Sequence, residues 1–301
     1  MVNVADLIKP LKSLLFVPGN RHAMLEKAST YGADALIPDM EDSVPPSSKG
    51  DARGLISSML PQLALEAAAV IPRVNTLTSG LMQSDLLAVV GPYIDGVTVG
   101  KVESREEVLE ICSILATTER RLGRPEGATR LIPWIETARG VANVLEICMS
   151  SPRICALAFG ADDYALDMGI TRSDEGSELV YARSVIGIAA RVGEVMALDT
   201  PYTHYRDHNG LVHEITVARQ YGFNGKFAIH PSQVDPIKEG FSPSREEMES
   251  ARRVVEIYEQ SEALGYGTAS LDGAMIDRPV VERARRLLIL AEGLERDDLD
   301  E

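Results

Sequence analysis

Two short apolar runs in the middle of the chain each lead into acidic residues. Glu136 directly follows Leu131–Ile135, and Asp162 and Asp163 follow Ala156–Phe159 after two small residues. Carboxylates that meet in a folded protein need a cation between them or a proton on one of them. Mg2+ prefers oxygen ligands and keeps coordination positions open for water and substrate. These residue types therefore predict a Mg2+ site, which Mn2+ could also fill.

A strand–helix–strand unit would bring these carboxylates together. Between the two runs, apolar residues recur at the spacing of a helix face: Val141, Val144, Leu145 and Cys148. Parallel strands joined by a helix end at the same side of a sheet, so Glu136 is expected to meet one of the two Asp residues there. An alternative for each acid taken alone is a helix N terminus, which favours a carboxylate by roughly 0.3–1 kcal/mol.

Eight apolar segments of this kind recur along the chain, with helical patterns between them. They are Ser13–Val17, Ala33–Ile37, Ala68–Ile71, Gly96–Val99, Leu131–Ile135, Ala156–Phe159, Val195–Leu198 and Lys226–Ile229. This number and spacing predict an α/β fold, a (β/α)8 TIM barrel, whose active site lies at the carboxyl ends of the strands. A doubly wound open sheet is disfavoured because no glycine-rich phosphate-binding motif follows any of the strands.

The chain continues well beyond the eighth segment. We predict a catalytic barrel over residues 1–240 and a helical extension over residues 241–301. The extension is expected to contain a helix from Pro243 to Leu264, a turn-rich connection over residues 265–273, and a last helix opened by Asp277-Arg278-Pro279. The last helix carries an apolar stripe that must be buried somewhere.

Composition excludes several classes of protein. The formal net charge of −15 and the 5% aromatic content argue against a nucleic-acid-binding protein. The sequence shows neither a signal-peptide pattern nor an apolar run near about 18 residues, so we expect no membrane partner. Its three cysteines fit neither a zinc spacing nor a disulfide framework, which is typical of a cytoplasmic protein. An anionic substrate would need a local basic patch to overcome the overall negative field.

Longer motifs follow one another over most of the chain. They are SLLFVPGN (13–20), ADALIPDMEDSVP (33–45), PRVN (72–75), KVES (101–104), IET (135–137), FGADDYALDMG (159–169), DTPY (199–202), GFNGKFAIHPSQ (222–233), FSPS (241–244) and DGAMIDRPV (272–280). With these motifs the chain resembles the citrate lyase beta-subunit-like CoA-ester lyases of the HpcH/HpaI aldolase family. The resemblance implies a barrel enzyme that uses Mg2+ to make or break the bond between the α-carbon of a thioester and a carbonyl carbon.

The resemblance also implies roles for single residues. Glu136 and Asp163 correspond to metal ligands, and Arg73 corresponds to the residue that faces the thioester carbonyl. A fixed cation there would stabilise the developing enolate oxygen, and arginine stays charged at any working pH. Asp277 corresponds to a catalytic acid or base that serves a neighbouring subunit's site. Its position before Arg-Pro is equally suited to capping a helix.

Other polar residues after the strands have several interpretations. We expect Asp39, Glu41 and Asp42 either to cap the next helix or to hold water molecules around the metal. Lys101 is interpreted as an ion-pair partner of the acids around it. Arg21 either reaches a phosphate of CoA or is a solvated surface residue.

The predicted function is that of a Mg2+-dependent carbon–carbon lyase. It would cleave a 3-hydroxy-dicarboxylic acyl-CoA, of the citramalyl-CoA or malyl-CoA type, reversibly to acetyl-CoA and pyruvate or glyoxylate. The alternatives are a citrate lyase beta subunit acting on a citryl thioester within a complex, a malate-synthase-like condensing enzyme, and a non-enzymatic barrel. The resemblance further predicts a closed homo-oligomer, a trimer or a dimer of trimers, in which each extension covers the next active site.

Overall fold

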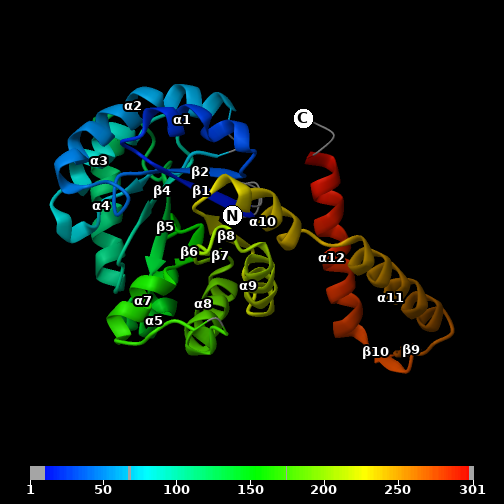
Figure 1. Ribbon diagram of the computed structural model, residues 1–301. Coiled ribbons are helices and arrows are strands. Elements are labelled where there is room, and N and C mark those ends of the chain that lie inside the picture. The colour runs from blue at the N-terminus through cyan, green and yellow to red at the C-terminus, as the bar shows by residue number, and fades with distance from the viewer. Residues whose placement is uncertain (1–10, 67–68, 174, 298–301) are drawn as a thin grey trace. The chain divides into compact units, whose positions relative to one another are not determined.

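The computed structural model describes residues 11–66, 69–173 and 175–297. These residues form two compact units, which divide between Lys238 and Glu239. The first unit is a barrel of parallel strands surrounded by helices, and the second is a helical hairpin with a small antiparallel sheet (Figure 1). The roles predicted for the two parts of the chain stay predictions.

Eight parallel strands close into a barrel in their order along the chain. They are β1 (Ser13–Pro18), β2 (Ala35–Asp39), β3 (Arg73–Val74), β4 (Gly96–Val99), β5 (Arg130–Ile135), β6 (Ala156–Phe159), β7 (Met196–Asp199) and β8 (Gly225–Ala228). The barrel closes where Ser13 of β1 pairs with Lys226 of β8. The predicted TIM barrel is therefore confirmed, and the doubly wound sheet is wrong.

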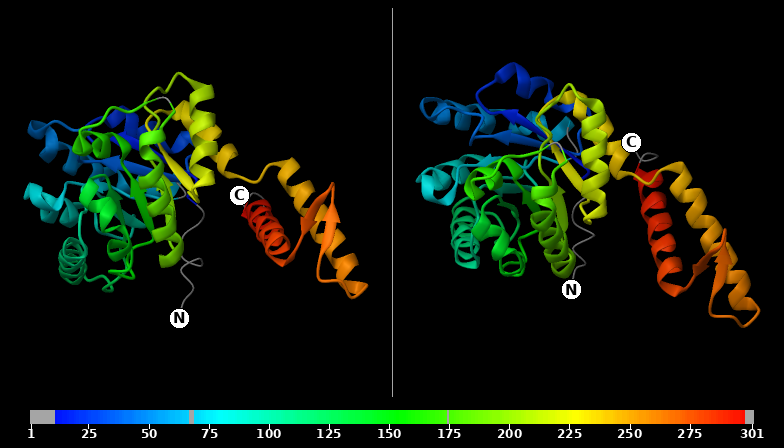
Figure 2. Two further views of the ribbon diagram at one scale, coloured as in Figure 1. Left: turned by 90° about the horizontal axis from the view of Figure 1, so that it is seen from below. Right: turned by 60° about the horizontal axis from the view of Figure 1, so that its bottom comes forward.

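Helices cover the outside of this barrel, as the two views of Figure 2 show. They are α1 (His22–Ala28), α2 (Lys49–Glu66), α3 (Met82–Val89), α4 (Arg105–Arg121), α5 (Ala138–Ala142), α6 (Val144–Cys148), α7 (Ala161–Met168), α8 (Val180–Gly193), α9 (His208–Gln220) and α10 (Val234–Phe241). Within the described ranges, no helix is both long and apolar enough to cross a bilayer.

The third strand lies further along the chain than predicted. We expected it at Ala68–Ile71, of which Ala68 lies outside the described residues, whereas β3 is Arg73–Val74. The backbone already pairs with β2 earlier, because Leu36 donates its N–H to the Ala69 carbonyl at 2.9 Å. Pro72 then interrupts the pairing, since proline has no N–H to donate. The consequence is that Arg73 stands within the strand, in register with Asp39 of β2.

The helix predicted between β5 and β6 is two short helices, α5 and α6. They are separated at Asn143, whose φ of −103° and ψ of 8° depart from helical values. The Asn143 side chain donates to the Glu103 carbonyl at 2.9 Å, which ties this break to the loop after β4. Of the predicted apolar face, Val141, Val144 and Cys148 are buried, but Leu145 is exposed, and the spacing did not show where the helix is interrupted.

Aromatic rings fill the centre of the barrel. Phe16, Trp134 and Phe227 pack with ring centroids 4.4 to 5.7 Å apart. The Trp134 indole N–H donates to the Thr98 hydroxyl at 2.6 Å, so its one polar group is satisfied in the core. This tightly packed aromatic core supports the ends of the strands rigidly.

The second unit consists of α11 (Arg245–Ala263), β9 (Ala269–Leu271), β10 (Ala274–Ile276) and α12 (Arg278–Asp297). Ser244 opens α11 with a reciprocal capping box to Glu247. Where a turn-rich connection was predicted, the chain forms a β-hairpin of β9 and β10. Its two-residue turn has φ of 50° at Asp272 and 82° at Gly273. Asp-Gly is a strong hairpin signal, which the sequence interpretation missed. Tyr258, Ile276 and Val281 form the small core of this unit.

Candidate functional site

Strands β2 and β3 position an arginine–aspartate pair at the carboxyl end of the barrel. The Arg73 guanidinium donates through Nε and Nη2 to the two carboxylate oxygens of Asp39, both at 2.7 Å. Burial alone would raise the pKa of Asp39, but the hydrogen bonds and charge of Arg73 outweigh burial and hold this pKa below its usual range. Asp39 therefore fixes the direction of the guanidinium.

The third nitrogen of Arg73 faces the acids of the next loop. Nη1 lies 3.1 Å from Glu41 and 3.3 Å from Asp42. Lys49 shapes this loop by donating to the carbonyls of Met40 and Glu41 at 2.8 and 2.7 Å. Burial first, and then the neighbouring Asp42, raise the pKa of Glu41 to about 8.

Glu136, at the end of β5, is held in a cradle made by two neighbouring loops. Its side chain is almost fully buried, and Oε1 accepts the Lys101 backbone N–H at 2.6 Å. Lys101 has a φ of 55°, which is uncommon for a residue with a side chain and turns its N–H toward the carboxylate. A Cβ at Gly100 would lie 2.9 Å from Oε1, and one at Gly160 would overlap Oε2. Both positions therefore require glycine.

Asp163 lies beside Glu136, in the first turn of α7. Burial first, and then the negative charge of Asp163, raise the pKa of Glu136 to about 7. The start of α7 is fixed because the Ala161 N–H donates to the Thr200 hydroxyl at 3.1 Å. The Lys101 ammonium lies 3.7 Å from Asp163 and 3.8 Å from Glu41, so it links the two acidic groups.

Seven charged side chains thus gather at this end of the barrel, and we refer to them as the mouth cluster. They are Asp39, Glu41, Asp42, Arg73, Lys101, Glu136 and Asp163. Five are carboxylates and two are cations, so the group carries a surplus of negative charge. Burial is the main reason that the pKa values of Glu41 and Glu136 are raised, and the neighbouring carboxylates add to it.

The donor set suits a hard divalent cation. Glu136 and Asp163 offer carboxylate oxygens, and the glycines around Glu136 leave room close to its oxygens. Among the described residues, no group of three or more His, Cys, Asp or Glu side chains is arranged as a ready-made metal cage. Mg2+ usually binds through one or two carboxylates and keeps several positions for water and substrate. A site with two protein ligands therefore suits Mg2+ better than a site that encloses the ion completely.

Comparison with known proteins identifies the family. The family model described as HpcH/HpaI aldolase/citrate lyase matches residues 12–231. The chain belongs to this family. Citrate lyase subunit beta of Escherichia coli K12 is 38% identical over 281 residues, covering 93% of each chain. Human mitochondrial citramalyl-CoA lyase is 31% identical over 294 residues, covering 94% of this chain and 86% of the human protein.

Solved structures share the fold. One is CitE of Mycobacterium tuberculosis in complex with magnesium, acetoacetate and coenzyme A. It superposes with a TM-score of 0.79 at 28% identity, covering 93% of this chain and 98% of that chain. The predicted family and the predicted lyase class are thus confirmed.

Three of the acidic and basic residues singled out in the sequence lie outside the mouth cluster. The Asp162 side chain is more than half exposed and pairs with Arg172 at 2.9 Å, which leaves Asp163 as the acid that faces Glu136. Arg21 is exposed at the start of α1. Asp277 belongs to the second unit, where its carboxylate accepts the Val280 N–H at 3.3 Å and so caps α12. The roles of these residues in binding or catalysis stay predictions.

A second group of charged side chains, which we call the buried network, lies on the side of β7 and β8 that faces the helices. Its buried or largely buried members are Arg172, Arg183, Asp199, Glu214 and Lys226, and Asp162, whose side chain is more than half exposed, pairs with Arg172 at its outer edge. Lys226 is fully buried and lies 2.7 Å from Asp199 and 2.8 Å from Glu214. Leu198 and Phe227 point into the barrel core, so Asp199 and Lys226 point outward, toward the helices. Asp199 therefore belongs to this network, although it directly follows a strand's apolar run as the mouth residues do.

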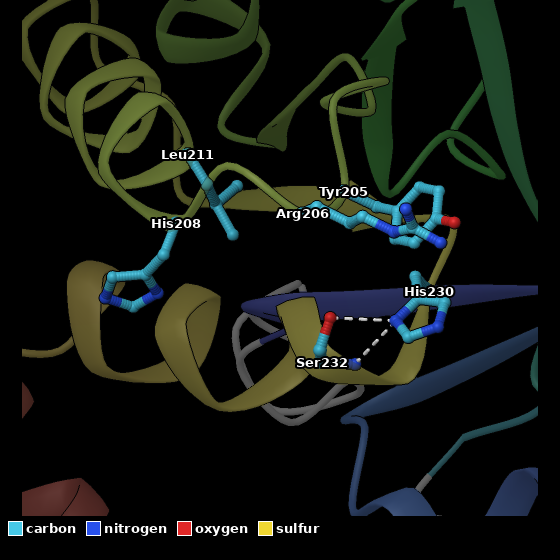
Figure 3. A pocket seen from close by; sticks show the side chains of 6 residues that line it. All are labelled: Tyr205, Arg206, His208, Leu211, His230 and Ser232. Carbon is cyan, nitrogen blue, oxygen red and sulfur yellow. Dashed lines mark hydrogen bonds between the residues drawn. The ribbon is translucent and has the colours of Figure 1, made fainter.

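A pocket lies beside the loops after β7 and β8. It has a volume of about 510 Å3 and is lined by Tyr205, Arg206, His208, Leu211, His230 and Ser232. Figure 3 shows His208 and Leu211 on one side and Tyr205, Arg206 and His230 on the other. The sequence interpretation assigned no role to Tyr205 or Arg206. The basic residues in the loop that precedes α9 were the signal that could have found them.

Proposed function

We propose that the protein is a Mg2+-dependent lyase that cleaves a 3-hydroxy-dicarboxylic acyl-CoA to acetyl-CoA and an α-keto acid. The observation that carries this proposal is the carboxylate surplus of the mouth cluster, in which Glu136 and Asp163 offer oxygen ligands beside the fixed cation Arg73. The substrates that fit are of the citramalyl-CoA or malyl-CoA type, which give pyruvate or glyoxylate. Support comes from the human citramalyl-CoA lyase and from the tuberculosis protein bound to magnesium and coenzyme A.

Glu136 and Asp163 are the residues that would hold Mg2+. The bound ion supplies Lewis-acid chemistry at substrate oxygens, including a lower pKa for the substrate hydroxyl. The cradle of Gly100, Gly160 and the Lys101 N–H holds the Glu136 oxygens in one orientation. A ligand fixed in this way needs no reorganisation when substrate binds.

Arg73 would stabilise the enolate. Once the 3-hydroxyl has passed its proton to solvent, the oxygen's electron pair forms the carbonyl of the α-keto acid, and the bond between the substrate's second and third carbons breaks. The released pair passes into the thioester, which becomes the enolate of acetyl-CoA. Asp39 holds the Arg73 guanidinium in place, so the positive charge of Arg73 is already positioned to stabilise the oxygen anion that develops. Protonation of the enolate carbon completes the reaction, and the reverse sequence is a Claisen-type condensation.

We assign this last proton transfer to Asp277 of a neighbouring subunit. In this proposal the extension, residues 241–301, covers the active site of the next chain in a homotrimer or a dimer of trimers. The test mixes two inactive variants, Asp277→Asn and Glu136→Ala, and allows subunits to exchange. Activity should return because a mixed assembly contains sites with both halves intact. If exchange is demonstrated and the mixture stays inactive, Asp277 works within its own chain or only caps α12.

A second candidate is a citrate lyase beta subunit that acts on a citryl thioester within a larger complex. It is favoured by the higher identity to the Escherichia coli citrate lyase subunit than to the human citramalyl-CoA lyase. A third, a malate-synthase-like enzyme, would add a hydrolysis step that releases free CoA.

A panel of thioesters separates these candidates. Malyl-, methylmalyl- and citramalyl-CoA are incubated with the protein and Mg2+, or with excess EDTA, and the products are identified by mass spectrometry. We expect acetyl-CoA or a close homologue plus an α-keto acid with Mg2+, and no turnover with EDTA. Turnover only after acyl-carrier and transferase subunits are added would favour the citrate lyase candidate. Release of free CoA with a free hydroxy acid would favour the synthase.

A further inference from the structure

Two lysines of the barrel each lie between two carboxylates, but they are held very differently. Lys226 of the buried network is fully buried, and its ammonium donates to two carboxylates at 2.7 and 2.8 Å. Lys101 of the mouth cluster has a side chain that is 41% exposed, and its ammonium lies 3.8 Å from Glu41 and 3.7 Å from Asp163. Hydrogen bonds therefore fix Lys226, whereas Lys101 is attracted by charge across distances too long for a hydrogen bond.

The main chain of Lys101, in contrast to its side chain, is fixed. Its N–H donates to Glu136 Oε1 at 2.6 Å, and its backbone has a left-handed φ of 55°. The next residue, Val102, is buried and donates its N–H to the Trp134 carbonyl at 3.2 Å. The ammonium is thus carried beside the carboxylates on a flexible four-carbon stem. Among the described residues, none accepts a hydrogen bond from it, so it can move without breaking one.

The position of Lys101 suits it to offset negative charge while no metal ion is bound. The mouth cluster has five carboxylates and one further cation, Arg73, whose guanidinium is engaged by Asp39 and by the acids of the next loop. The ion pair that reaches Asp163 comes from Lys101 instead. The Lys101 ammonium therefore supplies the positive charge beside Asp163 when no divalent ion is present.

A divalent ion bound to Asp163 and an ammonium 3.7 Å from Asp163 carry charge of the same sign. They therefore repel each other, and the repulsion is screened less in a partly buried site than in bulk water. The ion and the ammonium also compete for the same carboxylate. Removal of the ammonium should consequently leave acids that bind a divalent ion more tightly.

We infer that Lys101 is a placeholder cation, which offsets the acids of the mouth cluster while no divalent ion is bound and opposes the binding of that ion. The inference rests on the proposed function, in which Glu136 and Asp163 hold Mg2+. The left-handed backbone that brings the Lys101 N–H to Glu136 also brings the competing charge beside Asp163. The consequence is an ion that is held less tightly than the carboxylates alone would hold it.

Titration with Mn2+, followed by electron paramagnetic resonance without substrate, tests the inference. Lys101→Met keeps an unbranched side chain but removes the charge, and it should tighten Mn2+ binding about tenfold, the order of magnitude of one charge–charge interaction in a partly exposed site. Lys101→Arg keeps the charge and should not bind Mn2+ more tightly than the wild-type chain. Lys27→Met, which removes an exposed lysine of α1 outside the mouth cluster, is the matched control and should bind Mn2+ as the wild type does.

Thermal unfolding gives a second readout. An ion that binds only the folded chain raises Tm by an amount that grows with its affinity. At one fixed Mn2+ concentration, the rise in Tm above that in EDTA should be larger for Lys101→Met than for the wild type, and Lys27→Met should match the wild type. The curves in EDTA also show that each variant is folded.

Unchanged or weaker Mn2+ binding by Lys101→Met would overturn the inference, because the ammonium would then not oppose the ion. An equal gain in Lys27→Met would overturn it as well, since the effect would come from net charge alone. A wild-type chain that binds no Mn2+ would refute the proposed metal site and the inference together. That outcome is distinct from a wild-type chain that binds Mn2+ without any gain in Lys101→Met, which refutes the inference alone.

Discussion

The mouth cluster and the buried network are built from the same residue types but differ in charge balance. The mouth cluster has five carboxylates and two cations. The buried network has three carboxylates and three cations. In the network, burial would raise the pKa of Asp199, but Lys226 and Arg183 outweigh burial and hold this pKa below its usual range. In the cluster, burial and neighbouring acids raise the pKa values of Glu41 and Glu136.

This difference separates a structural charge group from a functional one. Opposite charges in the network satisfy one another, so it needs no further ligand to be stable. The cluster has fewer positive than negative charges, and a divalent cation would offset the difference. Perturbed carboxylates at the carboxyl ends of barrel strands are a recognised mark of a functional site. Substitutions that keep the side-chain shape but remove charge should therefore act oppositely in the two groups.

The largest expected effect is on activity at the mouth cluster. Glu136→Gln and Asp163→Asn should each reduce kcat by about 10³-fold or more, because losing preorganised charge stabilisation alone costs about 10²–10³-fold and the metal site is lost as well. Steady-state kinetics with saturating Mg2+ measures this. Circular dichroism and urea unfolding should show a folded protein of unchanged or higher stability, because Glu136→Gln removes like-charge repulsion. A large loss of stability would mean that Glu136 is a structural residue.

The buried network should respond in stability instead. Lys226→Met leaves Asp199 and Glu214 without their buried ammonium partner, and removal of one member of a buried ion pair costs about 3–5 kcal/mol. Urea unfolding followed by circular dichroism checks the free energy of unfolding. The exposed Arg245→Met, which breaks only a surface pair with Glu249, is the control and should change stability by less than about 1 kcal/mol. Equal effects of the two substitutions would contradict the distinction.

Arg73→Lys should have a smaller effect than either of these substitutions. The planar guanidinium makes two parallel bonds to Asp39 that an ammonium does not reproduce, so the cation would no longer be held in one direction. We expect kcat to fall by about 10–10²-fold, less than the loss of a whole oxyanion donor, because the positive charge remains. Measured KM for the thioester should change much less than kcat. A change confined to KM would assign Arg73 to binding alone.

The last expected effect is on the pH dependence of stability and concerns a balanced buried pair near the amino ends of β5 and β6. Glu119 and Arg153 lie 2.6 Å apart, and although burial opposes it, Arg153 lowers the pKa of Glu119 from 4.5 to about 2. Because the pKa of Glu119 is lower in the folded than in the unfolded protein, its ionised carboxylate stabilises the folded state above pH 4.5, the pKa in the unfolded state. This contribution to the free energy of unfolding is lost as the pH falls toward 2. Glu119→Gln should therefore flatten the decline in stability across that range. Unfolding curves at several pH values would show it, and an unchanged slope would contradict the assignment.

The sequence predicts most of the barrel because each strand has an apolar run and a polar end. It also predicts that Glu136 meets one of the two Asp residues, since that follows from parallel strands, whereas the choice of Asp163 depends on the family resemblance. It did not place β3 correctly, because the pairing of residues 69–74 with β2 depends on the partner strand and not on local pattern. The Asp272-Gly273 hairpin, in contrast, had a local signal that was available.

The charge balance of the two groups could not be predicted from the sequence, for a physical reason. Lys226 and Asp199 pair because β7 and β8 are neighbours in register, and no local spacing connects them. Likewise, the left-handed backbone of Lys101, which brings its N–H to Glu136, has no sequence signal in a lysine. Such features arise from tertiary contacts, so only the folded chain distinguishes the cluster from the network.

Direct Mn2+ binding, followed by electron paramagnetic resonance without substrate, tests the central claim that the mouth cluster is a divalent-cation site. The wild-type chain should bind one Mn2+ that excess Mg2+ displaces. Glu136→Gln and Asp163→Asn should lose this binding. Asp162→Asn should keep it, because Asp162 pairs with Arg172 outside the cluster. Wild-type-like Mn2+ binding by both Glu136→Gln and Asp163→Asn would contradict the claim.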